Sequence, residues 1–387
     1  MFSEERGFDS IRWGMVGGGR GSQIGYIHRA SAQRDGTFKL LAGAFDINFE
    51  RGKEFGMNLG VAEDRLYPTY KEMFEAESKR PDGIQAVSIA TPNATHYEIA
   101  KAALEAGFHV VCEKPLCFTS EQAEELKNLT EQKNKVFGVT YGYTGAQMVH
   151  QARKMIENGD LGEIRVINMQ FAHGFHSEEV ELNDPGTKWR VSPEVAGPTY
   201  VLGDVGTHAL FLAEVMVPNL HISKLLCHRQ SFVKSRAPLE DNAVVLLEYD
   251  NGAVGTLWAS AVNAGSMHQH KIRVIGSKAS IEWLDEHPNQ LKYEVQGEPA
   301  RVLDRGMGYL YDDETVNCDR LGGGHAEGLF EAWANLYRRF GIAMNAYITD
   351  NKDNILIYPN VYNGVEGVKF IEKCVESADN GSTWVNY

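Results

Sequence analysis

The sequence predicts an α/β protein of two domains: a doubly wound Rossmann domain over residues 1–145 and an α+β domain with an antiparallel sheet over residues 146–387. A chain of 387 residues is longer than one hydrophobic core usually organises, so two domains are expected. In the first part, short apolar runs alternate with amphipathic segments, which indicates parallel βαβ units. In the second part, strand-like runs follow one another with few helices between them, which is typical of an antiparallel sheet.

The elements of the first domain are predicted from hydrophobic periodicity and from capping signals. Thr69 with Glu72, and Thr119 with Gln122, fit capping boxes that begin helices. An alanine-rich helix is expected over residues 94–106. The predicted strands span residues 11–16, 38–45, 84–90, 108–112 and 136–140.

The second domain is predicted as a run of strands with three helices around it. Asn251-Gly252 between two apolar runs is a strong hairpin signal. The helices are expected near residues 146–158, 204–216 and 326–340, and the apolar stripe of the last one is interpreted as core. The predicted strands span residues 164–172, 223–233, 243–249, 253–260, 271–275 and 280–283.

Composition excludes several classes of partner. A formal charge of −14 is unfavourable for binding a phosphate backbone, so no nucleic-acid partner is expected. The charged N-terminus lacks the apolar core of a secretory signal, and no apolar run is long enough to span a bilayer. Five cysteines without a CxxC pair predict reduced thiols and a cytoplasmic protein. The pairs Cys112/Cys117, His173/His176 and His268/His270 lack further ligands at metal spacing, so no metal site is predicted.

A glycine-rich loop follows the first predicted strand and precedes a helix, which is the context of a dinucleotide-binding turn. Glycines let a backbone approach a pyrophosphate, and a helix N-terminus attracts its charge. Gly17-x-Gly19-x-x-Ser22 lacks the usual third glycine, and Gly25 is its alternative across a longer loop. A tight turn that binds no ligand is the other reading of this pattern.

Asp46 ends the second predicted strand, 21 residues after Gly25, where an acid accepts hydrogen bonds from the adenosine ribose. The sequence therefore predicts NAD as cofactor, with NADP as the alternative, because a carboxylate repels a 2′-phosphate. Arg51 is five positions away, and Arg20 in the glycine loop is expected to be the cation that would soften this discrimination. A solvated aspartate at a strand end is the alternative interpretation.

Three further motifs accompany the loop: Thr91-Pro92-Asn93-x-x-His96, Glu113-Lys114-Pro115 and Asp204-x-x-x-His208. The first two follow predicted strands, so they are expected at the carboxyl edge of the sheet together with the loop. With Trp189-Arg190, this ordered set resembles the Gfo/Idh/MocA family, which includes glucose-fructose oxidoreductase and inositol dehydrogenases. The resemblance runs from about residue 11 to residue 340. It implies a Rossmann domain, a domain with a large open, mainly antiparallel sheet, NAD or NADP, and a sugar or polyol substrate.

The resemblance also implies the role of each motif residue. Lys114 would contact the hydroxyl that loses its proton, and the bond to Pro115 would be cis. His208 would be the general acid and base, with Asp204 orienting the substrate or the imidazole. Imidazole titrates near neutral pH, an ammonium stabilises a developing alkoxide, and i,i+4 spacing puts both residues on one side of a helix.

The predicted site contains two overlapping sets of residues. The cofactor-binding set is Gly17, Gly19, Arg20, Ser22, Gln23, Ile24, Asp46, Thr91, Pro92, Asn93, His96, Glu113, Lys114, Trp189 and Arg190. The substrate-binding set is Lys114, Tyr143, His176, Arg190, Asp204 and His208. Trp189-Arg190 is also compatible with a surface cation–π stack, Tyr143 with a core position, and His176 with an ordinary loop.

These residues predict an NAD-dependent dehydrogenase that oxidises a secondary hydroxyl of a sugar, glycoside or cyclitol. The alternatives are a redox-neutral enzyme that uses bound NAD transiently for elimination or epimerisation, and a non-catalytic dinucleotide sensor. A homo-oligomer, dimer or tetramer, is expected through the open face of the second sheet.

Overall fold

The computed structural model describes residues 8–353 and 355–387, which fall into two compact units. The parallel-sheet unit contains the chain up to Gly142 together with Leu329–Val365. The mixed-sheet unit contains Tyr143–Gly328 and Glu366–Tyr387. The boundary after Gly142 lies close to the division expected at residue 145, but the later segment Leu329–Val365 differs from that expectation, because it is compact with the first unit.

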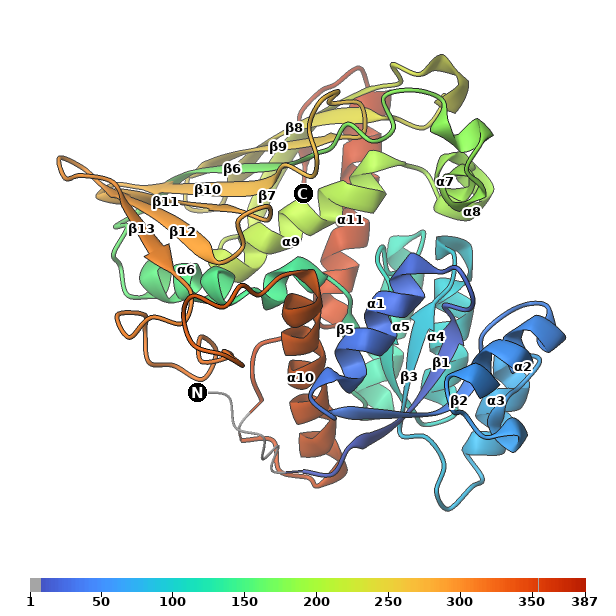
Figure 1. The fold of residues 1–387 in the computed structure, drawn as a ribbon. Helices are drawn as coiled ribbons and strands as arrows, with labels where there is room; N and C mark the ends of the chain where they lie inside the picture. The colour runs from blue at the N-terminus through green and yellow to red at the C-terminus, as the bar shows by residue number, and fades with distance from the viewer. Residues whose placement is uncertain (1–7, 354) are drawn as a thin grey trace. The chain divides into compact units, whose positions relative to one another are not determined.

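The parallel-sheet unit is a Rossmann fold, as predicted. Its strands are β1 Ile11–Gly17, β2 Phe38–Ala44, β3 Ala86–Ala90, β4 His109–Cys112 and β5 Phe137–Val139. They pair in parallel in the order β2-β1-β3-β4-β5 (Figure 1). The helices between them are α1 Gln23–Arg34, α2 Phe49–Asn58, α3 Tyr70–Glu77, α4 His96–Glu105 and α5 Ser120–Gln132.

Both predicted capping boxes are confirmed. The Thr69 hydroxyl accepts the backbone N–H of Glu72 at 3.2 Å and begins α3. The Thr119 hydroxyl accepts the N–H of Gln122 at 3.2 Å and begins α5. Each cap satisfies a donor that the first helical turn leaves unpaired, so these helices begin where the local sequence dictates.

Helix α10, Leu329–Ile348, packs against the parallel sheet far from its own place in the chain. Trp333, Tyr337 and Phe340 lie in the same buried cluster as Trp13 and Phe38. The prediction that this helix forms core is confirmed, and the core is that of the parallel-sheet unit. Gly138 lets the helix approach closely, because an added Cβ there would lie 2.4 Å from the Phe340 ring.

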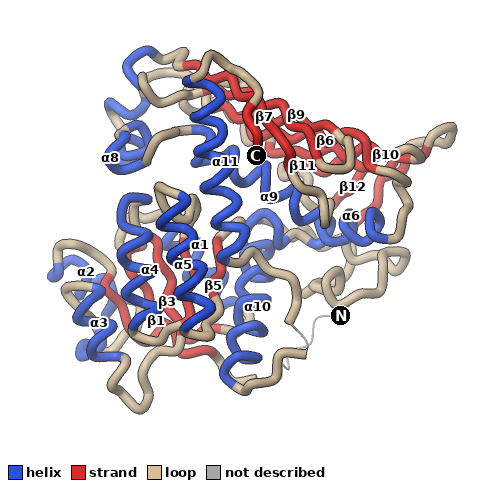
Figure 2. The backbone as a smooth tube through the Cα atoms, turned by 180° about the vertical axis from the view of Figure 1, so that it is seen from behind, coloured by secondary structure: helices blue, strands red, loops and turns tan. Residues whose placement is uncertain are grey.

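The mixed-sheet unit is built on nine strands, with helices α6 Gln147–Glu157 and α9 Thr207–Met216 on one face (Figures 1 and 2). Neighbouring strands are antiparallel except for the parallel pair β6–β9. Strands β12 to β14 and helix α11, Val361–Asp379, were not predicted. The strands in spatial order are β13 Arg301–Asp304, β12 Gln290–Val295, β11 Ala279–Leu284, β10 His270–Gly276, β6 Ile164–Ala172, β9 Val254–Ser260, β8 Asn242–Tyr249, β7 Ile222–Gln230 and β14 Val385–Asn386.

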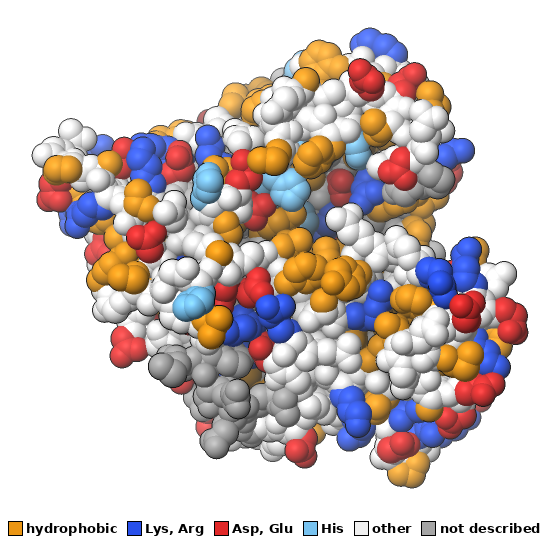
Figure 3. Space-filling view, viewed as in Figure 1, with side chains coloured by type: hydrophobic (Ala, Val, Ile, Leu, Met, Phe, Trp, Pro, Cys, Tyr) orange, Lys and Arg blue, Asp and Glu red, His pale blue; other side chains and the backbone are white. Residues whose placement is uncertain are grey.

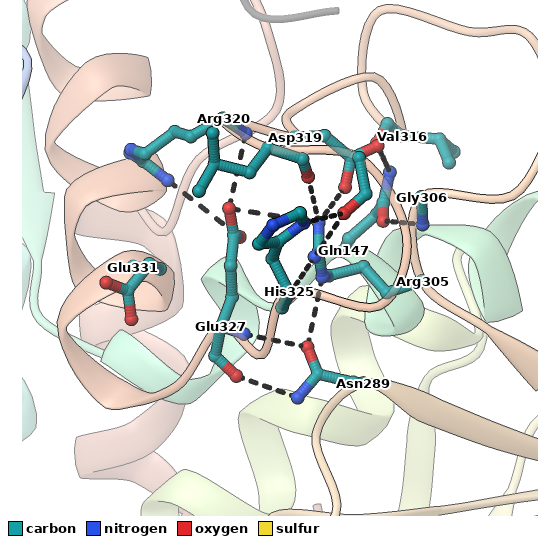
Figure 4. A network of polar contacts seen from close by, with 12 residues as sticks. Gln147, Asn289, Arg305, Gly306, Val316, Asp319, Arg320, His325, Glu327 and Glu331 are labelled. Carbon is teal, nitrogen blue, oxygen red and sulfur yellow. Dashed lines mark hydrogen bonds and ion pairs between the residues drawn. The ribbon is translucent and has the colours of Figure 1, made fainter.

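A long coil after β13 is held by the buried side chain of Arg305 (Figure 4). Its guanidinium pairs with Asp319, donates to Asn289 Oδ1 at 3.0 Å, and donates to backbone carbonyls farther along the coil. Gln147 on α6 donates to Val316 O at 2.7 Å and to Asp319 at 2.9 Å. The coil lacks the backbone hydrogen bonds of a helix or sheet, and the Arg305 guanidinium binds several of its carbonyl groups instead.

Candidate functional site

The glycine loop of the parallel-sheet unit leaves no room for a side chain at Gly17, Gly18, Gly19 or Gly25. Gly17, Gly18 and Gly21 have φ of +74°, +65° and +84°, the left-handed region that favours glycine. A Cβ on Gly19 would lie 2.6 Å from the carbonyl oxygen of Phe45. A Cβ on Gly25 would lie 2.3 Å from the Gly18 oxygen, so Gly25 takes the role of the third glycine, as the longer-loop alternative anticipated.

The loop leads directly into helix α1. Ser22 is its N-cap, and the Ser22 hydroxyl accepts the N–H of Gly25 at 3.1 Å. The loop backbone therefore meets the positive end of the α1 dipole. A tight, glycine-rich backbone at a helix N-terminus fits a pyrophosphate, which supports a dinucleotide rather than an empty turn.

Asp46 lies next to this loop and is bound by an arginine. Arg51 donates from Nε to Oδ2 at 2.6 Å and from Nη2 to Oδ1 at 2.7 Å. The Arg51 hydrogen bonds lower the pKa of Asp46, which keeps the carboxylate ionised and able to accept ribose hydroxyls. Arg20 pairs instead with Glu54 at 2.8 Å. The expectation that Arg20 is the cation near Asp46 is therefore corrected to Arg51.

The turn that carries Lys114 is held from one side by His96. The Lys114–Pro115 bond is cis, as the family resemblance implied. His96 has no exposed surface, and its two ring nitrogens lie 2.9 Å from Pro115 O and 2.9 Å from Thr91 O. Burial lowers the pKa of His96, and a neutral ring, which has a single N–H, donates to only one of these two carbonyl oxygens. The contact of His96 with the cofactor stays a prediction.

Glu113 is also buried rather than open to a ligand. Its Oε1 accepts from His28 Nε2 at 3.0 Å and from the Thr140 hydroxyl at 2.5 Å. The sequence patterns did not point to His28 or Thr140, and Arg51 was considered near Asp46 but Arg20 was preferred. The partner of each lies on a different element or beyond a turn, so no local motif identifies it.

In the mixed-sheet unit, Asp204 and His208 lie on a helix that begins with a π-turn. Residues Leu202–Gly206 form this turn, and regular α-helix follows from Thr207. Sequence reasoning anticipated an ordinary helix here. The π-turn rotates Asp204 relative to the α-helical part, and such turns are frequent at functional sites.

Asp204 is paired with Arg190 at 3.3 Å, and the Arg190 guanidinium lies 4.6 Å from the centre of the Trp189 ring. The cation–π stack that was the alternative interpretation of this pair is therefore present, and Arg190 pairs with Asp204 as well. His208 is 7% exposed. Its ring contacts that of Tyr143 edge to face, with centroids 5.1 Å apart. Tyr143 and His208 thus share one aromatic cluster with Phe171 and His270.

His176 stands beside the same helix. It shares a short hydrogen bond with the Tyr200 hydroxyl, and the two rings are stacked with centroids 6.1 Å apart. Burial lowers the pKa of His173 to about 4, so His173 is neutral near pH 7.

Within residues 8–353 and 355–387, no group of three or more His, Cys, Asp or Glu side chains is arranged to hold a metal ion.

A buried carboxylate, Glu240, holds the beginning of the π-turn. Its Oε1 accepts the backbone N–H groups of Tyr200 at 3.1 Å and Leu202 at 3.0 Å. Arg229 is its nearest cation, 3.7 Å from Oε2. Burial raises the pKa of Glu240 to about 7.

We expect Glu240 to make stability depend on pH. Unfolded glutamate titrates near pH ~4.3, whereas folded Glu240 keeps its proton up to about pH 7. The folded state thus binds more protons, and the free energy of unfolding falls as pH rises from about 4.3 to about 7. Urea unfolding across this window should show wild type losing up to roughly 3 kcal/mol relative to Glu240→Gln. Parallel curves for the two proteins would contradict the assignment.

Two family models together cover most of the chain. One, described as oxidoreductase family, NAD-binding Rossmann fold, matches residues 11–141. The other, described as oxidoreductase family, C-terminal alpha/beta domain, matches residues 153–387. The chain belongs to the Gfo/Idh/MocA oxidoreductase family. The resemblance seen in the motifs is confirmed, and the fold that it implied is present in both units.

Similar members of the Gfo/Idh/MocA family include both solved structures and curated proteins. An inositol dehydrogenase homolog from Azotobacter vinelandii, solved with NAD+, is 61% identical with a TM-score of 0.97, and the match covers 100% of both chains. Its complex with NADH and myo-inositol has a TM-score of 0.94 over 98% of both chains. The uncharacterized oxidoreductase YfiI from Bacillus subtilis (strain 168) is 58% identical over 97% of each chain. Levoglucosan dehydrogenase from Pseudarthrobacter phenanthrenivorans is 28% identical over 64% of this chain and 68% of its own.

The surface of this family member carries charges of both signs. On the face that Figure 3 shows, lysine and arginine side chains are interspersed with aspartate and glutamate. In the described part of the chain, no helix has the length and apolar character needed to cross a membrane. All five cysteines lie within the described residues, are buried and form no disulfide there.

Proposed function

We propose that this family member is an NAD-dependent dehydrogenase that oxidises a secondary hydroxyl of a cyclitol or a related sugar. The observation that carries the proposal is the buried imidazole of His208, four residues after Asp204, which is itself paired with Arg190. The relative solved with NADH and myo-inositol supports a cyclitol, because it is 61% identical over nearly the whole length. The buried, reduced thiols are consistent with a cytoplasmic enzyme.

The proposed chemistry divides between the two units. Oxidation of a carbinol removes a hydride from carbon and a proton from oxygen, and the nicotinamide of bound NAD supplies the hydride acceptor. His208 accepts the hydroxyl proton as general base. Lys114 stabilises the negative charge that develops on the same oxygen. Asp204, oriented by Arg190, fixes the substrate or the imidazole.

A substrate screen that follows NADH absorbance tests the proposal. Purified protein with NAD is assayed against myo-inositol and other inositols, free sugars, glycosides, levoglucosan and sugar acids. We expect NADH formation with the highest kcat/KM for an inositol. Substrate conversion without NADH accumulation would instead indicate redox-neutral chemistry, and no conversion of any compound would contradict the proposal.

We expect the enzyme to prefer NAD over NADP by at least about tenfold. A 2′-phosphate would meet Asp46 and lose a hydrogen bond to a charged acceptor, which is worth roughly 1.5–3 kcal/mol. Arg51, already held by Asp46, limits the penalty because it is a cation that could pair with the phosphate. Asp46→Ser should therefore raise kcat/KM for NADP relative to NAD.

The double variant Asp46→Ser/Arg51→Ala is the matched control for this cofactor prediction. The double variant should not show the increase in kcat/KM for NADP. Arg51, the cation that Asp46→Ser frees to pair with the 2′-phosphate, is replaced by alanine in it. Equal use of both cofactors by the wild type would show that Asp46 does not read the ribose.

We also propose a homo-oligomer, a dimer or tetramer, assembled through the open face of the mixed sheet. Val244 and Leu246 on β8 and Val254 on β9 are 39%, 39% and 46% exposed. An apolar face of this kind is typical of an interface. Leu246→Glu should convert the oligomer to a smaller species in size-exclusion chromatography with light scattering, whereas Met57→Glu on α2 should not. A wild-type monomer at micromolar concentration would contradict this prediction.

A further inference from the structure

A chain of buried hydrogen bonds runs through the parallel-sheet unit and ends one residue before Lys114. Trp13 Nε1 donates to Ser88 Oγ at 2.9 Å, and Ser88 Oγ lies 2.9 Å from the Tyr337 hydroxyl. The Tyr337 hydroxyl shares a short hydrogen bond with His28 Nδ1, and His28 Nε2 lies 3.0 Å from Glu113 Oε1. None of these residues is more than 7% exposed. They come from β1, β3, α10, α1 and the end of β4.

The direction of these hydrogen bonds follows from the donor at the beginning of the chain. An indole N–H can only donate, so the Ser88 oxygen accepts from Trp13 and the Ser88 hydroxyl is left to donate to Tyr337. Tyr337 then donates to His28 Nδ1, and His28 donates from Nε2 to Glu113. With a neutral His28, each N–H or O–H hydrogen of the chain is donated to the next member. In a charged His28, Nδ1 would also donate, and the Ser88 hydrogen would lose its acceptor within the chain.

The acceptor at the end of this chain is an ionised carboxylate. Burial alone would raise the pKa of Glu113, but the hydrogen bond from His28, the charge of Lys114 and the hydrogen bond from Thr140 bring it below its usual value. A buried carboxylate without such donors is very unfavourable. The titratable groups around Glu113 are His28 on α1, His96 on α4, Cys112 on β4, Tyr337 on α10 and the neighbouring Lys114.

We propose that His28 and Tyr337 are positioning residues for the Glu113-Lys114-Pro115 turn. They hold the Glu113 carboxylate in one place, and Glu113 fixes the backbone from which Lys114 extends. His96 holds the same turn at Pro115 O, so the turn is fixed at both ends. The inference rests on the proposed function, because Lys114 is the residue proposed to act on the substrate hydroxyl.

The proposal assigns a functional reason to the place of α10. A helix that follows more than three hundred residues of chain packs on the first sheet and delivers one hydroxyl, that of Tyr337, to the interior. If Tyr337 served only for packing, phenylalanine at this position would pack equally well. The substitution Tyr337→Phe therefore separates the positioning role from the packing role.

Steady-state kinetics of Tyr337→Phe test the proposal. We expect kcat to fall about 10- to 100-fold, the usual cost of a misplaced catalytic group, with a small change in KM for NAD. Tyr347→Phe on the same helix is the control, since the Tyr347 ring stacks with Lys352 and lies outside the chain of buried hydrogen bonds. An unchanged kcat in a folded Tyr337→Phe protein would overturn the proposal.

A second variant covers the case in which Tyr337→Phe does not fold. Thr140→Val removes the other donor to Glu113 without a change in shape, and it should also lower kcat with a small change in KM for NAD. Its failure to do so would also contradict the proposal.

A spectroscopic measurement separates this inference from the proposed function. In ¹⁵N-histidine protein, long-range ¹H–¹⁵N spectra should show His28, assigned with His28→Gln, as the neutral Nε2–H tautomer at pH 7. Tyr337→Phe should shift its Nδ1 resonance. If no substrate is turned over, the proposed function fails while the hydrogen-bond chain is still tested. A charged His28, or one unaffected by Tyr337→Phe, would overturn the inference on its own.

Discussion

Replacement of Lys114 by alanine is expected to lower kcat/KM by about 10³-fold or more. The ammonium stabilises an oxygen that gains negative charge, and the loss of one such group typically costs about 10²–10³ in kcat. Lys114 follows the buried, ionised Glu113 in a turn held by His96, so the structure keeps its backbone in place. KM for the substrate should rise as well, because the same group contacts the bound hydroxyl.

Lys114→Met and Lys114→Arg make this prediction specific. Methionine keeps the length of the side chain without the charge, and it should behave like alanine. Arginine keeps the charge but is bulkier and planar, and it should recover only part of the activity. Initial rates of NADH formation with saturating NAD measure all three variants. Turnover in Lys114→Met close to wild type would remove Lys114 from the chemistry.

His208→Ala is expected to lower kcat by roughly 10²–10⁴-fold, the usual contribution of a general acid or base. His208 is 7% exposed and belongs to the mixed-sheet unit, so binding of NAD to the parallel-sheet unit should be preserved. The acid limb of the kcat/KM profile should disappear, because a protonated imidazole cannot accept the hydroxyl proton and alanine has no such group.

The control for His208→Ala is His221→Ala, an exposed histidine that lies just before β7. It should have no effect on kcat. NADH binding, followed by quenching of protein fluorescence, should be equal in both variants and in the wild type. A His208→Ala enzyme that retains its acid limb would show that another group accepts the proton.

Features of the site that are encoded locally could be predicted from the sequence. Ser22, Thr69 and Thr119 could be predicted as helix caps or loop ends because the backbone N–H groups that they accept lie three residues further on. Each predicted strand of the parallel sheet lies within two residues of its observed bounds, because buried parallel strands are short, continuous apolar runs. Gly17, Gly19 and Asp46 were predicted because a dinucleotide turn requires those residue types at that spacing.

Strand β13 lies at the edge of the mixed sheet, and β12 lies next to it. In β13, Arg301 and Val302 are exposed while Leu303 is half-buried. In β12 the residues Leu291, Tyr293 and Val295 alternate with polar ones, so its pattern was present in the sequence but was not recognised. Period-2 patterning depends on one buried face, which an edge strand barely has. Backbone pairing of β12 with β11, and of β13 with β12, adds both strands to the sheet, and that pairing is not visible in a single segment.

Only the tertiary structure determined which polar groups, distant in the sequence, pair with one another. The sequence contains His28, Glu113 and Tyr337, but their separations of 85 and 309 residues carry no pattern that would join them. The same holds for Glu240, which binds backbone N–H groups 38 and 40 residues away. Even at short range the pairing of polar groups was not predicted. Arg51 lies only five residues after Asp46, but the turn before α2 determines that the two side chains meet. Periodicity and capping are short-range effects that each segment expresses by itself, whereas a buried polar group takes whichever partner the packed chain brings within reach, because burial without a partner is too costly.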